Sequence, residues 1–293
     1  MIARLQRWLV LAWLAIALFW LGVWAGRSPA VAVTGLCVLV FGHACFLAFE
    51  FLASYRVGAG DQAPRPGPLQ CVGAWLAECL VAPRVFCWLQ PFRWREIPDQ
   101  LAPDPRRGVV LVHGFVCNRG FWTPWLAALR AEGRVFVAVD LEPPFGSIDN
   151  YVRIVDEAIV RVTEATGRPP VLICHSMGGL AARAWLRDFD GTRVHRIVTI
   201  GTPHHGTWLA RFGRTANGRE MRMGGEWLQK IDCERATAQQ VPFTCWYSNC
   251  DNIVFPTSVA TLPGADNRLR PGKGHVEMAF DDRLRRETLA LLD

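Results

Sequence analysis

Apolar residues are concentrated at the start of the chain, where two long uncharged runs follow one another. The runs cover residues 8–26 and 28–49, so they hold 19 and 22 residues. An α-helix rises about 1.5 Å per residue and the hydrocarbon core of a bilayer is about 30 Å thick, so each run can span it. The pattern predicts a two-helix transmembrane hairpin within residues 1–56. A cleaved signal peptide followed by one anchor is the alternative interpretation.

The arginines around these runs predict an orientation. Arg4 and Arg7 precede the first run, Arg27 alone lies between the runs, and Arg56 and Arg65 follow the second. Positive residues accumulate on the cytoplasmic side of membrane proteins. We therefore expect both ends of the hairpin, and the chain that follows it, to face the cytoplasm.

Residues 57–104 are predicted to form a linker and an apolar helix. Residues 58–70 are rich in glycine and proline, which indicates irregular structure. Residues 71–82 are apolar on nearly every face and are followed by Pro83, so the predicted helix is too short to span a bilayer. We expect it to pack on the domain that follows, with an interfacial helix as the alternative.

From about residue 105, strand and helix patterns alternate. Apolar, β-branched runs predict strands at residues 108–113, 134–139, 170–174, 194–200 and 241–247, with helical patterns between the first four. This order predicts an α/β fold with a mostly parallel sheet flanked by helices, and chemistry at the carboxyl ends of its strands. Residues 207–235 interrupt the rhythm. We interpret them as a lid-like insertion in which Trp208 and Trp227 bind substrate, a packed helix pair being the alternative.

Composition narrows the classes of protein that fit. Of the first 55 residues 41 are hydrophobic, whereas the remainder has the apolar content of an ordinary globular domain. The net charge of +6 is too small to indicate nucleic-acid binding. The ten cysteines include no closely spaced metal-binding pair, so we predict no metal site.

The third predicted strand runs directly into a serine on a tight turn. Residues 174–179 read CHSMGG, and a helix is predicted to follow. Such a turn presents the hydroxyl of Ser176 as a nucleophile and directs the backbone N–H of Met177 at a developing oxyanion. The first predicted strand ends in His113 and Gly114, after which the N–H of Phe115 would be the second oxyanion donor. We expect His113 itself to be structural.

Five segments together give a resemblance. They are VVLVHGF at 109–115, CHSMGG at 174–179, GTPHHGT at 201–207, YSNCDNIVFP at 247–256 and GHV at 274–276. With them, residues 105–293 resemble the α/β-hydrolase superfamily and are most similar to bacterial triacylglycerol lipases and esterases. One departure is Cys174, which replaces the first glycine of the serine motif.

The resemblance implies a catalytic triad in the order serine, acid, histidine. On this order Asp251 is the acid and His275 the base, with Asp232 and Asp266 as rival acids. The adjacent histidines 204 and 205 match a loop-shaping segment of lipases, so we do not assign them to a metal.

These expectations combine into a function. We predict a membrane-anchored serine hydrolase that cleaves carboxylic esters of lipid-like acyl chains through an acyl-enzyme, with the catalytic domain at residues 105–293. Its predicted partners are the ester substrate and membrane lipids, its predicted location is a bacterial inner membrane, and no cofactor is assigned, calcium staying open because some related lipases bind it. An acyltransferase or thioesterase with the same triad is the alternative, and a non-catalytic membrane scaffold is a further one.

Overall fold

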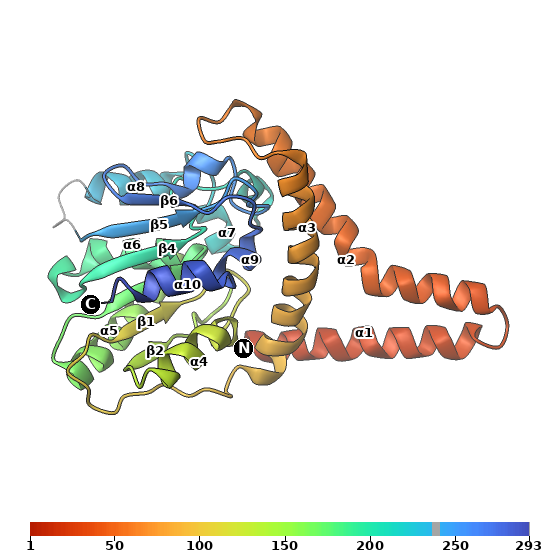
Figure 1. Cartoon of the computed structure of the whole chain (residues 1–293), viewed down its shortest axis with the longest axis horizontal. Helices are drawn as coiled ribbons and strands as arrows, with labels where there is room; N and C mark the ends of the chain where they lie inside the picture. Colours follow the sequence, from red (N-terminus) through yellow and green to blue (C-terminus); the bar gives the residue numbers. More distant parts are fainter. Residues whose placement is uncertain (236–240, 293) are drawn as a thin grey trace.

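The centre of the molecule is a six-stranded parallel sheet with the strand order β2-β1-β3-β4-β5-β6. The computed structural model describes residues 1–235 and 241–292 (Figure 1). The strands are β1 (Val109–Val112), β2 (Phe136–Ala138), β3 (Val171–His175), β4 (Arg196–Ile200), β5 (Phe243–Tyr247) and β6 (Asp266–Leu269). The α/β-hydrolase architecture expected from the sequence is confirmed.

Helices cover both faces of the sheet, which explains why its inner strands read as continuous apolar runs. Helices α5 (Val152–Thr166) and α6 (Met177–Asp188) pack on one face, against alternate residues such as Val110 and Leu172. Helices α4 (Thr123–Ala131), α9 (His275–Ala279) and α10 (Asp282–Leu289) belong to the core on the opposite face.

The sequence patterns found five strands but missed β6. This strand reads DNRL, and its residues are exposed or half-buried because it pairs only with β5, at the edge of the sheet. An edge strand has no need of the apolar run by which the other strands were recognised. Polar edge strands are therefore invisible to a search based on hydrophobic periodicity.

Three long apolar helices precede the sheet. Helix α1 (Ile2–Trp24), helix α2 (Pro29–Val57) and helix α3 (Pro68–Pro83), which continues as a π-helical segment (Arg84–Arg93), are each long and apolar enough to cross a membrane. The prediction of a short helix ending at Pro83 was wrong. The helix passes Pro83 by changing to π-helical winding, one of the local adjustments by which helices accommodate a proline.

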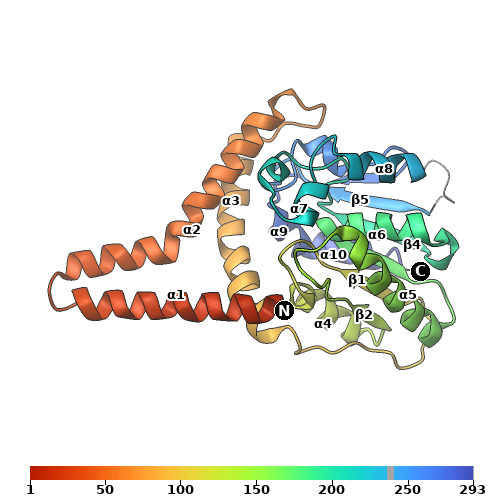
Figure 2. The same cartoon turned by 180° about the vertical axis from the view of Figure 1, so that it is seen from behind.

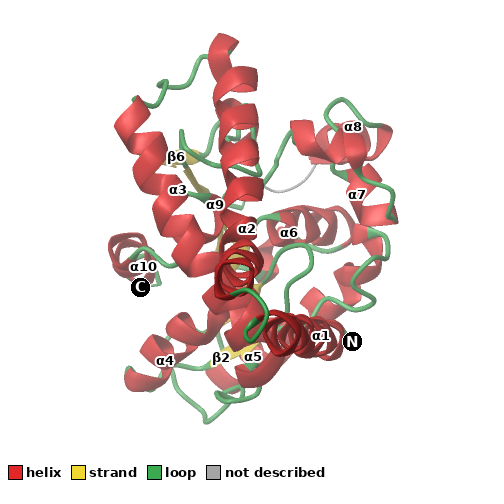
Figure 3. Ribbon diagram, turned by 90° about the vertical axis from the view of Figure 1, so that its right-hand side faces the viewer, coloured by secondary structure: helices red, strands yellow, loops and turns green. Residues whose placement is uncertain are grey.

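The three helices meet the sheet at one edge. Helix α3 runs across the carboxyl ends of the strands, while α1 and the first half of α2 project away from the domain as a hairpin (Figures 1 and 2). Figure 3 looks onto this edge and shows α2 and α3 in front of the sheet. The edge where chemistry is expected is thus the edge that the apolar helices cover.

The predicted insertion at 207–235 holds a 3₁₀ segment (Trp208–Phe212) and two short helices, α7 (Ala216–Glu220) and α8 (Glu226–Arg235). Helix α7 packs on the loop after β2, where Glu220 accepts hydrogen bonds from Ser147 and the backbone of Ile148. Helix α8 packs on α6, to which an ion pair between Asp232 and Arg183 connects it.

Candidate active site

Ser176 occupies a strained turn between β3 and α6. Its backbone has φ 53° and ψ −128°, a combination that non-glycine residues adopt only where the surroundings enforce it. The enforcing contacts are a hydrogen bond from its N–H to the carbonyl of Ile200 (2.9 Å) and one from Gly179 N–H to its own carbonyl (3.1 Å). The turn therefore has the shape that a nucleophilic serine requires.

Two glycines beside the serine are required by close packing. A Cβ atom on Gly178 would overlap the backbone oxygens of β1 at Val112 and His113, and one on Gly114 would lie 2.7 Å from the Cβ of Ser176. Cys174 stands where the serine motif has its first glycine. The replacement is tolerated because Cys174 lies within β3, with its side chain fully buried in the core.

Asp251 and His275 form a buried, directly bonded pair. Nδ1 of His275 donates to Oδ2 of Asp251 over 2.9 Å, and both side chains are almost completely buried. The second carboxylate oxygen of Asp251 accepts the backbone N–H groups of Ile253 (2.8 Å) and Val254 (2.7 Å). These bonds fix the carboxylate, so that one oxygen faces the imidazole.

The imidazole of His275 lies in an electrostatic environment that favours its protonated form. Burial lowers its pKa, but the charge and hydrogen bond of Asp251 and the charges of Glu78 and Glu50 outweigh burial, so the pKa is raised above its ordinary value. The neighbouring ring of His175, at 4.6 Å between centroids, adds no charge because burial lowers its pKa well below the ordinary value.

Gly201, at the end of β4, shows that the three predicted residues come together. The backbone N–H of Ser176 donates a hydrogen bond to the carbonyl of Ile200, the residue before Gly201. A Cβ atom on Gly201 would lie 3.1 Å from Oδ2 of Asp251 and 3.2 Å from Cε1 of His275. The serine, the acid and the histidine therefore gather at the carboxyl edge of the sheet.

The two predicted oxyanion donors belong to segments that adjoin the serine. Met177 is the first residue of α6 and is buried. Phe115 follows Gly114, which contacts Ser176 closely. The next residue, Val116, has φ 57°, a strained value for a β-branched side chain. Its carbonyl accepts a hydrogen bond from Gln6 of α1 (3.1 Å), which helps to hold this loop.

Comparisons with known proteins agree with the fold. A family model described as "Alpha/beta hydrolase family" matches residues 109–238. The chain has the alpha/beta hydrolase fold, and residues 109–238 are similar to that family.

Solved structures with the same fold include two lipases. A Bacillus licheniformis lipase, BlEst2 in its mature form, is 18% identical with a TM-score of 0.59, the match covering 65% of this hydrolase and 94% of that chain. A Paleococcus ferrophilus monoacylglycerol lipase is 16% identical with a TM-score of 0.50, covering 65% and 95%. No curated protein matches the hydrolase by sequence. At these identities the likeness concerns the fold.

The rival acids are engaged elsewhere in the hydrolase. Asp232 pairs with Arg183, and Asp266 on the edge strand β6 pairs with Arg268. Neither contact involves the imidazole of His275, whose bonded carboxylate is that of Asp251.

The two tryptophans assigned to substrate binding lie in different surroundings. Trp208 stacks on Phe255 in the acid loop, with 5.8 Å between ring centroids, and its backbone N–H donates to the carbonyl of Phe255. Trp227 instead donates its indole N–H to Asp149 (3.1 Å) on the helical face of the domain. Trp208 is thus the one that contacts the loop carrying Asp251.

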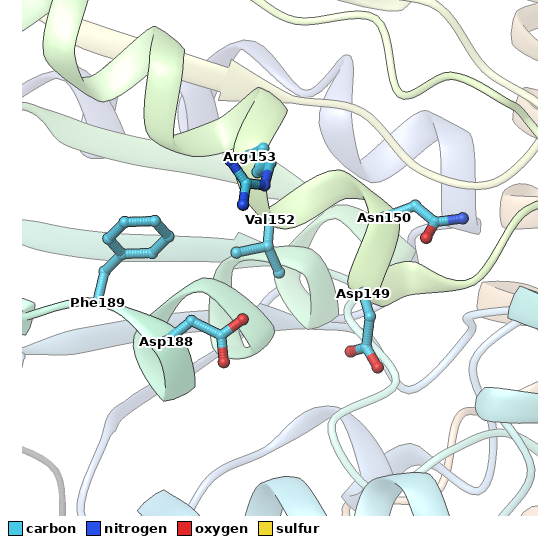
Figure 4. Close-up of a pocket in the computed structure, with 6 residues that line it drawn as sticks. All are labelled: Asp149, Asn150, Val152, Arg153, Asp188 and Phe189. Atoms are coloured by element: carbon cyan, nitrogen blue, oxygen red, sulfur yellow. The ribbon is translucent and has the colours of Figure 1, made fainter.

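A surface hollow of about 590 Å³ lies beside Asp149, and none of the three predicted triad residues lines it (Figure 4). Its lining comes from the start of α5 and the end of α6 and comprises Asp149, Asn150, Val152, Arg153, Asp188 and Phe189. Asp149 and Asp188 are both paired with Arg187. Both lining carboxylates therefore already have a cationic partner within the protein.

The motifs missed several residues that hold the site. His175 stacks on Phe121 at 4.4 Å and donates to the carbonyl of His275 (3.2 Å). Asn252 accepts the N–H of His275 (3.1 Å) and donates to Glu50 of α2 (2.8 Å). Glu50 carried a usable signal, because an ionisable residue within an apolar helix is seldom without a function.

Proposed function

We propose that this hydrolase is a membrane-anchored serine esterase acting on lipid-like carboxylic esters. The observation that carries the proposal is the buried Asp251–His275 pair, bonded at 2.9 Å beside the strained turn of Ser176. A serine hydroxyl is a weak nucleophile, so it needs an oriented base of this kind.

The reaction follows from these roles. Ser176 Oγ attacks the ester carbonyl as His275 takes its proton, while Asp251 keeps the imidazole in the required tautomer and stabilises the imidazolium. The N–H groups of Met177 and Phe115 bind the oxyanion. His275 then protonates the leaving alcohol, and water attacks the acyl-enzyme by the same route, releasing the acid and restoring Ser176.

The membrane helices support a lipid-like substrate. Helices α1 and α2 expose large apolar side chains along their length, Phe19 and Phe41 among them, as surfaces in contact with lipid do. The two solved relatives described above are named as lipases. We further propose that Trp208, which stacks on Phe255 in the acid loop, lines the acyl pocket.

Helix α3 fits an interfacial position better than a third span. Its inner face is buried through Ala74, Glu78 and Val85, whereas Leu76 and Leu80 lie on the exposed outer face. In Figure 1, α3 runs across the direction of α1. Because two crossed helices cannot both follow the bilayer normal, we propose that α1 and α2 span the membrane and α3 lies on its surface, on the cytoplasmic side that the arginines predict.

Active-site labelling tests the nucleophile. The detergent-solubilised hydrolase should react with a fluorophosphonate probe, and Ser176→Ala should lose the reaction completely. Ser28→Ala, in the turn between α1 and α2, is the matched control and should label like the parent. Labelling that survives in Ser176→Ala overturns the assignment.

Turnover of p-nitrophenyl esters with two to sixteen carbons tests the substrate class. We expect longer acyl chains to be preferred and the preference to shift in Trp208→Ala, whereas Trp227→Ala, whose indole binds Asp149, should keep the parent's preference. A change in stability without a shift in preference would contradict the pocket proposal.

A further inference from the structure

Each of the three apolar helices holds one loop of the candidate active site. Gln6 of α1 donates to the carbonyl of Val116 in the oxyanion loop (3.1 Å). Ser54 of α2 donates through its hydroxyl to the carbonyl of Asp251 itself (2.7 Å). Glu78 of α3 binds the segment that carries His275. The helices therefore hold the loops of the site in addition to their proposed role as an anchor.

Glu78 makes the most specific of these contacts. Its side chain is only 1% exposed, and its two carboxylate oxygens accept the N–H groups of Val276 and Glu277, each over 2.9 Å. Burial raises the pKa of Glu78 to about 7, and above that pH its carboxylate offers an acceptor on each oxygen without a proton to place. Gly274 leaves the room required, because a Cβ atom there would lie 2.6 Å from Oε2 of Glu78.

Helix α9 depends on such a partner. It has only five residues, and a helix this short has little stability of its own. Its first N–H groups have no intrahelical acceptor and need one from elsewhere. The N–H of His275 binds Asn252, which in turn binds Glu50 of α2, while Glu78 supplies the next two acceptors. The backbone that carries the imidazole is thus held from α2 and α3.

We propose that Glu78 is a positioning residue for His275, which it fixes through the backbone of Val276 and Glu277. This role rests on the proposed function, in which His275 is the base. It makes α3 a structural component of the catalytic site, placed more than 190 residues before the histidine in the chain. The ester-cleaving machinery of this hydrolase is then complete only when the apolar helices are docked.

Glu78→Gln tests the role in catalysis. The amide keeps the size but replaces one acceptor oxygen with an NH₂ group, which cannot accept the backbone N–H. A displacement of the imidazole by a fraction of an ångström should lower kcat by about 10- to 100-fold, with KM nearly unchanged. The acid limb of the pH profile should move to lower pH, because one of the three carboxylates that raise the pKa of His275 is lost, leaving Asp251 and Glu50.

Glu96→Gln is the matched control. Glu96 pairs with Arg93 at the surface, so this variant should keep the parent's kcat and pH profile. A Glu78→Gln enzyme with an unchanged kcat and acid limb would overturn the proposal. A Glu78→Gln enzyme that loses activity, but whose residual activity keeps the parent's acid limb, would also overturn the proposal. Glu78 would then only support the fold in general.

Hydrogen–deuterium exchange separates this proposal from the proposed function. In Glu78→Gln, peptides covering residues 275–280 should exchange faster than in the parent or in Glu96→Gln, whether or not the protein is an esterase. If Glu78→Gln fails to fold, Gly274→Ala is the second variant. Its added methyl group would displace the carboxylate of Glu78 and should give the same local increase in exchange. Unchanged exchange in both variants refutes the role of Glu78. If the variants exchange faster than the parent but the parent does not react with fluorophosphonate, only the esterase assignment is refuted.

Discussion

His275 is surrounded by negative charge although it is buried. Burial lowers its pKa, but Asp251, followed by Glu78 and Glu50, raises it above the ordinary 6.5. Because the imidazole must be neutral to accept the proton of Ser176, activity should fall as the pH drops through this raised pKa. The acid limb of kcat/KM for a p-nitrophenyl ester should therefore lie above pH 6.5. A flat profile between pH 5 and 8 would contradict His275 as the base.

Among individual residues, the sequence motifs identified only those that belong to a short recognisable segment of the chain. Ser176, Asp251 and His275 each lie in a short recognisable segment, and the structure brings them to the end of β4. Glu50 and Glu78 were missed because their partners lie 202 and 198 residues away. A hydrogen bond between such distant segments leaves no periodic pattern in the sequence.

Between elements, α6 approaches the backbone at the end of β1 closely at Gly178. Gly178→Ala should place a methyl group against the backbone oxygens of Val112 and His113, which cannot move aside as a side chain would. We expect the free energy of unfolding to fall by about 1–3 kcal/mol, measured by thermal or denaturant unfolding. Gly73→Ala, on α3 with no atom within 4 Å of the new methyl, should leave stability unchanged or slightly raised. Equal stability of the two variants would show that the approach is looser than described.

Elements were predictable from sequence where burial imposes a pattern. The five strands within or beside the buried core gave apolar runs, whereas β6 at the edge did not. The length of α3 was underestimated for a different reason. Proline normally ends a helix, but here Pro83 lies inside one that continues in π-helical form to Arg93.

For the whole molecule, the crossed arrangement of α1 and α3 predicts two different depth profiles. A fluorescent amino acid placed at Leu69, Leu80 or Trp88 should be quenched by brominated lipids to the same shallow depth, although the first and last positions are about 28 Å apart along a helix. The same label at Leu9 and Ile16 of α1 should report clearly different depths. A graded profile along α3 would make it a third span, and absence of quenching would remove it from the membrane surface.

The bonds between the apolar helices and the catalytic loops also set the order of assembly. During synthesis the helices are made first, and Val276, a partner of Glu78, follows Glu78 only 198 residues later. The partners of Glu78 at Val276 and Glu277 therefore do not exist until all six strands of the sheet have been made. We expect the enzyme to stay inert while it is being inserted and to become competent only afterwards, which would spare the membrane lipids around the growing chain.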